Sequence, residues 1–137
     1  MSEVISSMIA RDILKATGLS AQDFAVLSQL RTTHSGERKQ RDIQQFLGWD
    51  KSRLSHQLSR MTSRKVITRE NRPGQGAVVC ITEEGTRQID LAQPVHAAAV
   101  RQYFLSYLTT DDTDVLTGIA AKLREGLEPQ VNYDDFK

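Results

Sequence analysis

Apolar side chains recur with the period of an α-helix in the first part of the chain. Within 4–16, four of them fall on one side of a helix: Ile5, Met8, Ile9 and Ile13. Gly18 follows as a helix stop. A second helix is predicted to follow Ser20, because Ser20 and Asp23 have the spacing of a capping box and apolar residues then recur every third position. The polar stretch 34–39 contains a glycine and is predicted to be a loop.

Two shorter helices are predicted next, joined by a tight turn at Gly48. The first lacks a good capping residue, and its apolar stripe has three members: Ile43, Phe46 and Leu47. The second begins after Asp50, whose carboxylate suits the exposed amides and the positive end of the helix dipole. Its large apolar side chains fall in one narrow sector: Leu54, Leu58 and Met61. This helix therefore has one face for a core and one face left free.

Two runs rich in β-branched residues follow and predict a β-hairpin. The runs are VITREN and AVVCIT, and RPGQG between them supplies a proline and two glycines for a tight loop. The hairpin would form a wing with Arg72 at its tip.

A long helix is predicted to begin at Thr82, which is followed by two glutamates in the first turn. Its apolar pattern extends to Leu108, and Pro94 inside it is expected to kink the helix or remove a hydrogen bond. A capping box of Thr109 and Asp112 predicts one more helix before the polar tail 128–137.

This succession of elements predicts one domain over 1–137, mainly α with a small two- or three-stranded antiparallel wing. Residues 20–82 would form its winged helix-turn-helix core. The helices within 1–18 and 83–127 carry broad apolar stripes that a compact core covers only in part. We therefore expect them to be dimerisation helices that are buried against a second copy of the chain.

The charge of the chain is unevenly distributed. The segment 31–72 has eleven Lys or Arg and four acids, a net charge of +7, whereas the rest has seven bases and thirteen acids and is at −6. A concentrated basic block suits a polyanion, because phosphates are neutralised by local charge. The charge distribution by itself is equally consistent with a basic surface that faces solvent and binds no partner.

The free face of the helix after Asp50 predicts a DNA contact surface. The N-terminal half of such a helix can enter the major groove, where four side chains could contact base edges: Ser52, Arg53, His56 and Gln57. Five neighbouring cations are candidates for phosphate contacts: Lys39, Arg41, Lys51, Arg60 and Arg64. On the wing, Arg69 and Arg72 are candidates for contacts to the backbone or an adjacent minor groove.

The stretch LGWDKSRLSHQLSRM resembles the DNA-binding core of the MarR family of bacterial transcriptional regulators, and ITEEG resembles the family's junction between wing and long helix. The resemblance runs from about Leu19 to Leu123. It implies a winged-helix homodimer with interlocked terminal helices and a recognition helix at 51–63. It also implies that a small lipophilic or phenolic effector releases the protein from DNA. Together with the free face of the helix, it leads us to expect sequence-specific binding to double-stranded DNA. We expect a repressor acting on a pseudo-palindromic site.

The wing departs from the family pattern. The family usually carries an Asp-x-Arg pair whose arginine enters the minor groove, and the matching positions here are Pro73 and Gln75. Arg72 is the candidate substitute.

Two other functions stay open. The same helix could dock on an acidic partner, which would make the chain a winged-helix protein-interaction module. Cys80 could make it a thiol-sensing regulator, but no second cysteine exists to resolve an oxidised thiol, so a passive strand residue is favoured.

Several classes of protein are not expected. No arrangement of residues predicts catalysis, so we expect neither an enzyme nor a metal or cofactor site. A single cysteine excludes an intrachain disulfide. No apolar run is long enough to cross a membrane and the N-terminal residues do not resemble a signal peptide, so we expect a cytoplasmic protein.

Overall fold

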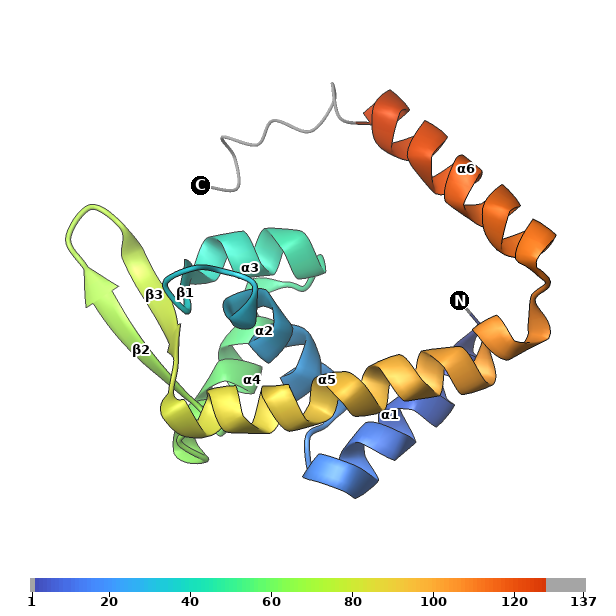
Figure 1. Cartoon of the computed structure of the whole chain (residues 1–137). Helices are drawn as coiled ribbons and strands as arrows, with labels where there is room; N and C mark the ends of the chain where they lie inside the picture. The colour runs from blue at the N-terminus through green and yellow to red at the C-terminus, as the bar shows by residue number, and fades with distance from the viewer. Residues whose placement is uncertain (1, 128–137) are drawn as a thin grey trace.

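The structure is a computed structural model that describes residues 2–127, and the tail predicted at 128–137 lies outside them. It is mainly α with a small antiparallel sheet of three strands, which confirms the predicted fold class. The elements in chain order are α1 (Glu3–Thr17), α2 (Ala21–Arg31), β1 (Glu37–Lys39), α3 (Gln40–Leu47), α4 (Lys51–Ser63), β2 (Ile67–Arg72), β3 (Gly76–Ile81), α5 (Glu83–Tyr103), the 3-10 turn η1 (Leu105–Tyr107) and α6 (Thr110–Leu127). Figure 1 shows the sheet at one end of the molecule and α6 at the other.

The predicted caps fix where the helices begin. Ser20 and Asp23 form both hydrogen bonds of the capping box at the start of α2. The carboxylate of Asp50 accepts a hydrogen bond from the Arg53 backbone N–H at 2.8 Å and starts α4. By contrast, α3 begins at Gln40, and the residue before it, Lys39, makes no side-chain cap hydrogen bond, as the sequence indicated. Local side-chain chemistry is therefore enough to set most helix starts.

The sheet has the strand order β1-β3-β2. Cys80 of β3 lies between Glu37 of β1 and Thr68 of β2 in the antiparallel register. The prediction of a loop across 34–39 was wrong for its second half, because residues 37–39 form β1. These three residues are all polar, so they lack the alternation of apolar and polar side chains that predicts a strand. The strand forms because it pairs with the edge of β3, and a local sequence pattern does not indicate such a distant partner.

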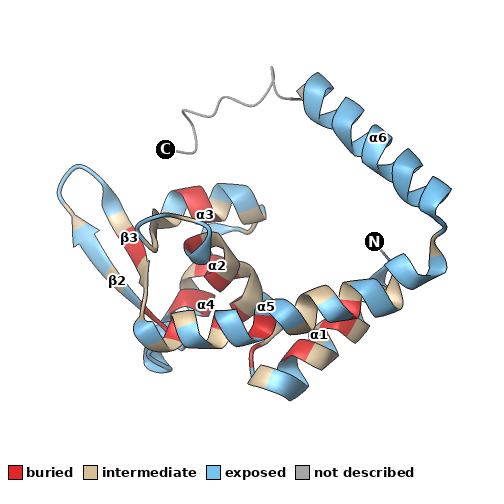
Figure 2. Cartoon of the chain, viewed as in Figure 1, coloured by how far each residue is buried: buried red, intermediate tan, exposed pale blue. Residues whose placement is uncertain are grey.

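One apolar core joins the helices to the sheet (Figure 2). Leu54, Leu58 and Met61 of α4 are fully buried in it, as predicted. Phe46 was predicted in the apolar stripe of α3, but its side chain is 58% exposed. Ile43 is the fully buried member of that stripe, because α3 is short and touches the core along a narrow line.

Gly85, the last residue of ITEEG, marks a close approach between α5 and the chain before β2. It is buried, and a β-carbon there would overlap the carbonyl oxygen of Val66. The Thr82 hydroxyl donates a hydrogen bond to the Lys65 carbonyl and accepts one from the Gly85 N–H. This junction fixes the start of α5 against the segment that joins α4 to β2.

Of the C-terminal elements, α5 packs along the core, whereas α6 lies apart from it (Figure 1). Pro94 lies within α5, and the helix continues beyond it to Tyr103. It therefore ends before Leu108, where the predicted pattern ended, and η1 follows. Thr109 and Asp112 form the predicted capping box of α6. Every side chain described in α6 is exposed (Figure 2).

No helix within residues 2–127 combines the length and hydropathy needed to cross a membrane.

Candidate nucleic-acid interface

Helices α3 and α4, joined by a turn at Gly48, form a helix-turn-helix with the hairpin β2–β3 beside it (Figure 1). The core holds one side of α4 and leaves Ser52, Arg53 and His56 exposed on the other. These three residues lie in the first two turns of the helix, as the sequence predicted. Their hydroxyl, guanidinium and imidazole groups are free to contact a ligand in solvent.

Arg53 is held in place by the residues that precede it. Its guanidinium carbon lies 4.3 Å from the centroid of the Trp49 ring, a cation–π contact. Trp49 in turn packs against the core. The sequence predicted a packing role for Trp49 and did not reveal its contact with Arg53, although a spacing of four residues around a helix start is a signal for one.

Gln57 does not lie on the free face, and the prediction that it does was wrong. Its side chain is 4% exposed and its Nε2 donates a hydrogen bond to Asp23 Oδ1 at 2.7 Å. Its carbonyl oxygen accepts a hydrogen bond from Arg60 Nη2 at 2.8 Å. On a helical wheel, Gln57 lies about 60° from Leu54, so the helix period already places it at the edge of the buried sector.

The five predicted phosphate-binding cations are not equivalent. Arg64 donates hydrogen bonds from both terminal nitrogens to Asp23 Oδ2 at 2.9 Å, so this cation is paired with a buried carboxylate of its own chain. Arg60 is bonded to Gln57 but exposed. Arg41 and Lys51 are also exposed, and Lys39 is partly buried.

A groove lies between α3, the start of α4 and the hairpin loop. Its volume is about 360 Å³. Its lining comprises two cations, two glutamines and the loop: Arg41, Lys51, Gln40, Gln44 and residues 74–77. No carboxylate lines the groove among the described residues, so it carries positive charge and amide donors that match a phosphate oxygen.

The two wing arginines point to different partners. Arg69 Nη2 donates a hydrogen bond to Ser59 Oγ at 2.8 Å and so ties the wing to α4. Arg72 donates hydrogen bonds to both carboxylate oxygens of Glu37, at 2.7 and 2.9 Å, and to Glu70 at 2.6 Å. Arg72 therefore lies in a network of ion pairs on the face of the sheet, and the hairpin loop itself, residues 73–75, carries no cation.

The same network contains Cys80. Its Sγ lies 3.5 Å from Glu70 Oε1 and 3.7 Å from Glu37 Oε2. Burial, followed by the neighbouring carboxylates, raises the pKa of the Cys80 thiol, whereas Arg72 lowers the pKa of both Glu37 and Glu70. A protonated thiol is a poor nucleophile and a poor target for oxidants, so this environment disfavours thiol sensing.

No group of three or more potential metal-ligating side chains is clustered within residues 2–127.

No protein-family model matches the sequence, and no curated protein does. The fold and sequence are similar to those of AbsC, a MarR family transcriptional regulator from Streptomyces coelicolor, with 27% identity and a TM-score of 0.78. That alignment covers 92% of this chain and 86% of AbsC. Sco3205, a MarR family transcriptional regulator from the same organism solved in complex with DNA, has 25% identity and a TM-score of 0.77, over 92% of this chain and 80% of its own. In both sequence and fold the chain is therefore similar to transcriptional regulators of the MarR family.

A third structure extends the comparison of folds. CouR from Rhodococcus jostii RHA1, solved bound to p-coumaroyl-CoA, superposes with a TM-score of 0.69 and 24% identity over 88% of this chain and 85% of its own. Helices α3 and α4 and the hairpin thus form a winged helix of the type found in the MarR family transcriptional regulators AbsC and Sco3205.

The contact between Asp23 and α4 was not predicted from the sequence, because the spacing of Ser20 and Asp23 indicated only a helix cap.

Proposed function

We propose that this protein is a MarR-family, sequence-specific, double-stranded DNA-binding transcriptional regulator that acts as a homodimer, represses transcription and binds a pseudo-palindromic operator. The observation that carries this proposal is the exposed face of α4 beside the cationic groove. The DNA complex of the related Sco3205 supports it.

The exposed residues divide into two groups by the chemistry they offer. Arg53 suits bidentate hydrogen bonding to guanine in the major groove, and Ser52 and His56 suit neighbouring base edges. Arg41 and Lys51 suit phosphates, which fix the position of the protein without specifying sequence. Gln57 and Arg64 contribute through Asp23 instead of through DNA.

A homodimer accounts for the exposed apolar side of α6. Four large apolar residues on this helix are 43–60% exposed: Val115, Leu116, Ile119 and Leu123. A helix of this length without packed neighbours is marginal in water, so burial against a second copy would stabilise it. The two-fold axis of such a dimer would place two α4 helices in successive major grooves, about 34–36 Å apart.

A small lipophilic or phenolic effector is proposed to bind a hollow between α1, α2 and α5. Its volume is about 180 Å³ and its surface is mostly apolar. His96 and Phe24, two of its lining residues, stack with ring centroids 4.9 Å apart. Cavities of roughly this size accept one aromatic ring. The bound p-coumaroyl-CoA of CouR supports an effector in this fold, and the hollow fits a single ring better than a whole CoA ester.

The test of the proposal is selection of genomic DNA fragments by the purified protein, followed by a salt titration of the selected fragments. A sequence-specific regulator enriches a common motif, and its affinity falls steeply with salt because counterions are released from the DNA. A protein-interaction module would enrich no motif. Repression is tested separately, by transcription from an enriched promoter, which should fall when the protein is added.

A further inference from the structure

We infer that Asp23 is the positioning residue of the recognition helix: this buried carboxylate on α2 holds α4 through Gln57 and Arg64 and so determines operator selectivity without touching DNA. The inference rests on the proposed DNA-binding function. It assigns to Asp23 a role beyond the cap of α2, and we call Asp23, Gln57 and Arg64 together the clamp.

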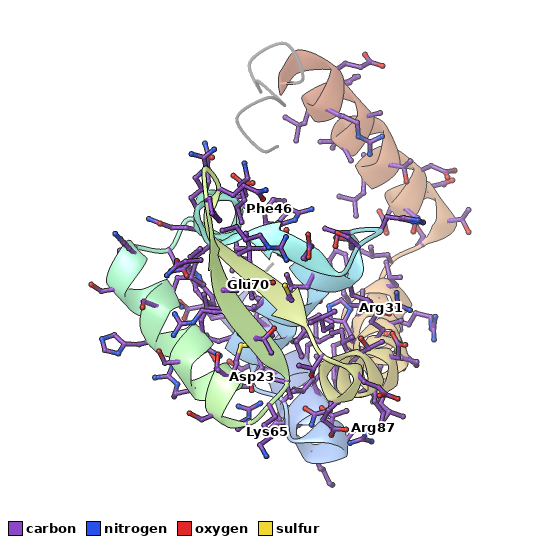
Figure 3. All side chains as sticks on the ribbon, turned by 90° about the vertical axis from the view of Figure 1, so that its left-hand side faces the viewer. Asp23, Arg31, Phe46, Lys65, Glu70 and Arg87 are labelled. Atoms are coloured by element: carbon purple, nitrogen blue, oxygen red, sulfur yellow. The ribbon has the colours of Figure 1, made fainter. Side chains whose placement is uncertain are left out.

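The geometry around Asp23 is that of a buried carboxylate whose partners come from two helices. Asp23 is 1% exposed. Its Oδ2 accepts a hydrogen bond from the Ser20 N–H at 2.9 Å and from both terminal nitrogens of Arg64 at 2.9 Å, while its Oδ1 accepts from Gln57 Nε2 at 2.7 Å. Figure 3 shows Asp23 beside α4. Charge-assisted hydrogen bonds of this kind are short and directional.

The two contacts from α4 lie nearly two turns apart. Gln57 and Arg64 are separated by seven residues, about 10 Å along the helix axis. Two fixed points on one side of a helix define its rotation as well as its position along the axis. The buried Leu54, Leu58 and Met61 hold α4 by hydrophobic contact, which is not directional and tolerates small rotations.

The orientation of α4 matters because contacts to base edges need accurate placement. Functional side chains must be held within about 0.5 Å and 10–20° of the productive geometry. Arg53 lies on the same rigid helix as Gln57, one turn earlier, and a rotation that frees Gln57 moves Arg53 as well. On the exposed side, Arg60 donates to the carbonyl of the same Gln57, so the network reaches the free face of the helix.

A merely structural role for Asp23 makes a different prediction from a positioning role. A variant that partly unfolds loses active protein and weakens binding to all DNA alike. A variant in which α4 is folded but rotated keeps its charge and loses only the fit to the operator. The ratio of operator to non-specific affinity therefore separates the two, provided that the active fraction is measured by stoichiometric titration.

The experiment compares Asp23→Asn and Gln57→Met with Ser20→Ala as the matched control. Ser20→Ala removes the hydroxyl that accepts from the Asp23 N–H and weakens the same helix start without removing a contact to α4. Binding is measured by fluorescence anisotropy on the selected operator and on an unrelated duplex of equal length. We expect the ratio to fall on the order of tenfold or more for the two clamp variants, which corresponds to the loss of one specific base contact. The ratio for Ser20→Ala should stay within about twofold of the wild type. An unchanged ratio in Asp23→Asn, or an equal fall in the control, overturns the inference.

Arg64→Met adds a second measurement. Because Arg64 is paired with Asp23, its replacement should leave the slope of log affinity against log salt unchanged. A slope reduced by about one would make Arg64 a phosphate contact and would overturn its place in the clamp.

Trp49, the one tryptophan of the sequence, makes failure of the inference distinguishable from failure of the proposed function. It lies at the α3–α4 corner, against Arg53, so its emission reports the placement of α4 without any DNA. A wild-type protein that prefers no duplex refutes the proposed function. In that case a Trp49 emission shift in Asp23→Asn, absent in Ser20→Ala, supports the clamp, and identical spectra overturn it.

Discussion

Arg53 is held at both its backbone and its side chain before any ligand arrives. Asp50 accepts a hydrogen bond from its N–H, and Trp49 lies against its guanidinium. A long side chain that is already ordered loses less conformational entropy when it forms a contact. Arg53, the residue best placed for a bidentate base contact, is therefore already ordered in the absence of DNA.

Replacement of Arg53 by alanine should relax specificity at one base pair of each half-site. The expected loss is about 1–3 kcal/mol at that base pair, measured as the difference in binding free energy between the operator and a single-base variant. Lys51→Ala is the control, because loss of a phosphate contact weakens all sequences alike and lowers the salt slope by about one. A uniform loss from Arg53→Ala would assign Arg53 to the phosphates.

Cys80 should react slowly with iodoacetamide at neutral pH. Its pKa lies above the ordinary thiol value, so the thiolate appears only as the pH rises past that value. The alkylation rate against pH, followed by mass spectrometry, should have its midpoint above that of a free cysteine in a peptide. Rapid alkylation at pH 7, together with peroxide-dependent release of DNA, would favour a thiol sensor.

At the scale of the elements, α2 connects two regions of the protein. Ala21 and Phe24 line the proposed effector hollow, and Asp23 between them contacts α4. A ligand in that hollow would touch the helix turn that positions the recognition helix. The element thus offers a short physical connection between an effector and DNA affinity.

Elements whose signals are local could be predicted from the sequence, and elements that depend on distant partners could not. Asp50 and the apolar spacing of α4 lie within a few residues of each other, and both were confirmed. The burial of Gln57 depends on Asp23, 34 residues away along the chain. Likewise, β1 exists because β3 offers it an edge, and Arg72 pairs with Glu37 across the sheet. DNA contacts of the site residues stay predictions.

Gly85→Ala should destabilise the protein, because the added β-carbon meets the carbonyl of Val66 where α5 begins. The expected cost is about 1–3 kcal/mol, typical of overpacking at a close contact. Gly118→Ala is the matched control, since nothing lies near that position on α6, and alanine there should stabilise the helix by about 1 kcal/mol. Denaturant unfolding of both variants measures this. Equal stabilities for Gly85→Ala and the wild type would show that the junction has room to adjust.

At the scale of the whole molecule, the distribution of exposed apolar surface points to a second copy of the chain. The winged helix buries its own core, whereas α6 lies apart from it with its apolar side in solvent (Figure 2). The net charge of +1 combines a +7 segment, 31–72, that lies within the winged helix with a remainder of the chain at −6. Dimerisation through α6, which lies in the part of the chain with net negative charge, would leave the two basic segments of the dimer available for one DNA duplex.

Ile119→Lys should shift the protein toward monomer, because it places a charge in the proposed interface. Thr117→Lys is the control, since it adds the same charge on the opposite side of α6. Sedimentation velocity at micromolar concentration should give a dimer for the wild type and for Thr117→Lys, and a smaller species for Ile119→Lys. The thermal midpoint of the wild type should also rise with protein concentration. A wild-type monomer at these concentrations would contradict the dimer.

The most direct test of the central claim, that α4 recognises a specific DNA site as one of a symmetric pair, is a hydroxyl-radical footprint on a selected fragment. We predict two protected half-sites related by a two-fold axis, with their centres one turn of DNA apart, about 34–36 Å. Protection should weaken as salt is raised. A fragment protected evenly along its length, or at one unpaired site, would contradict the account.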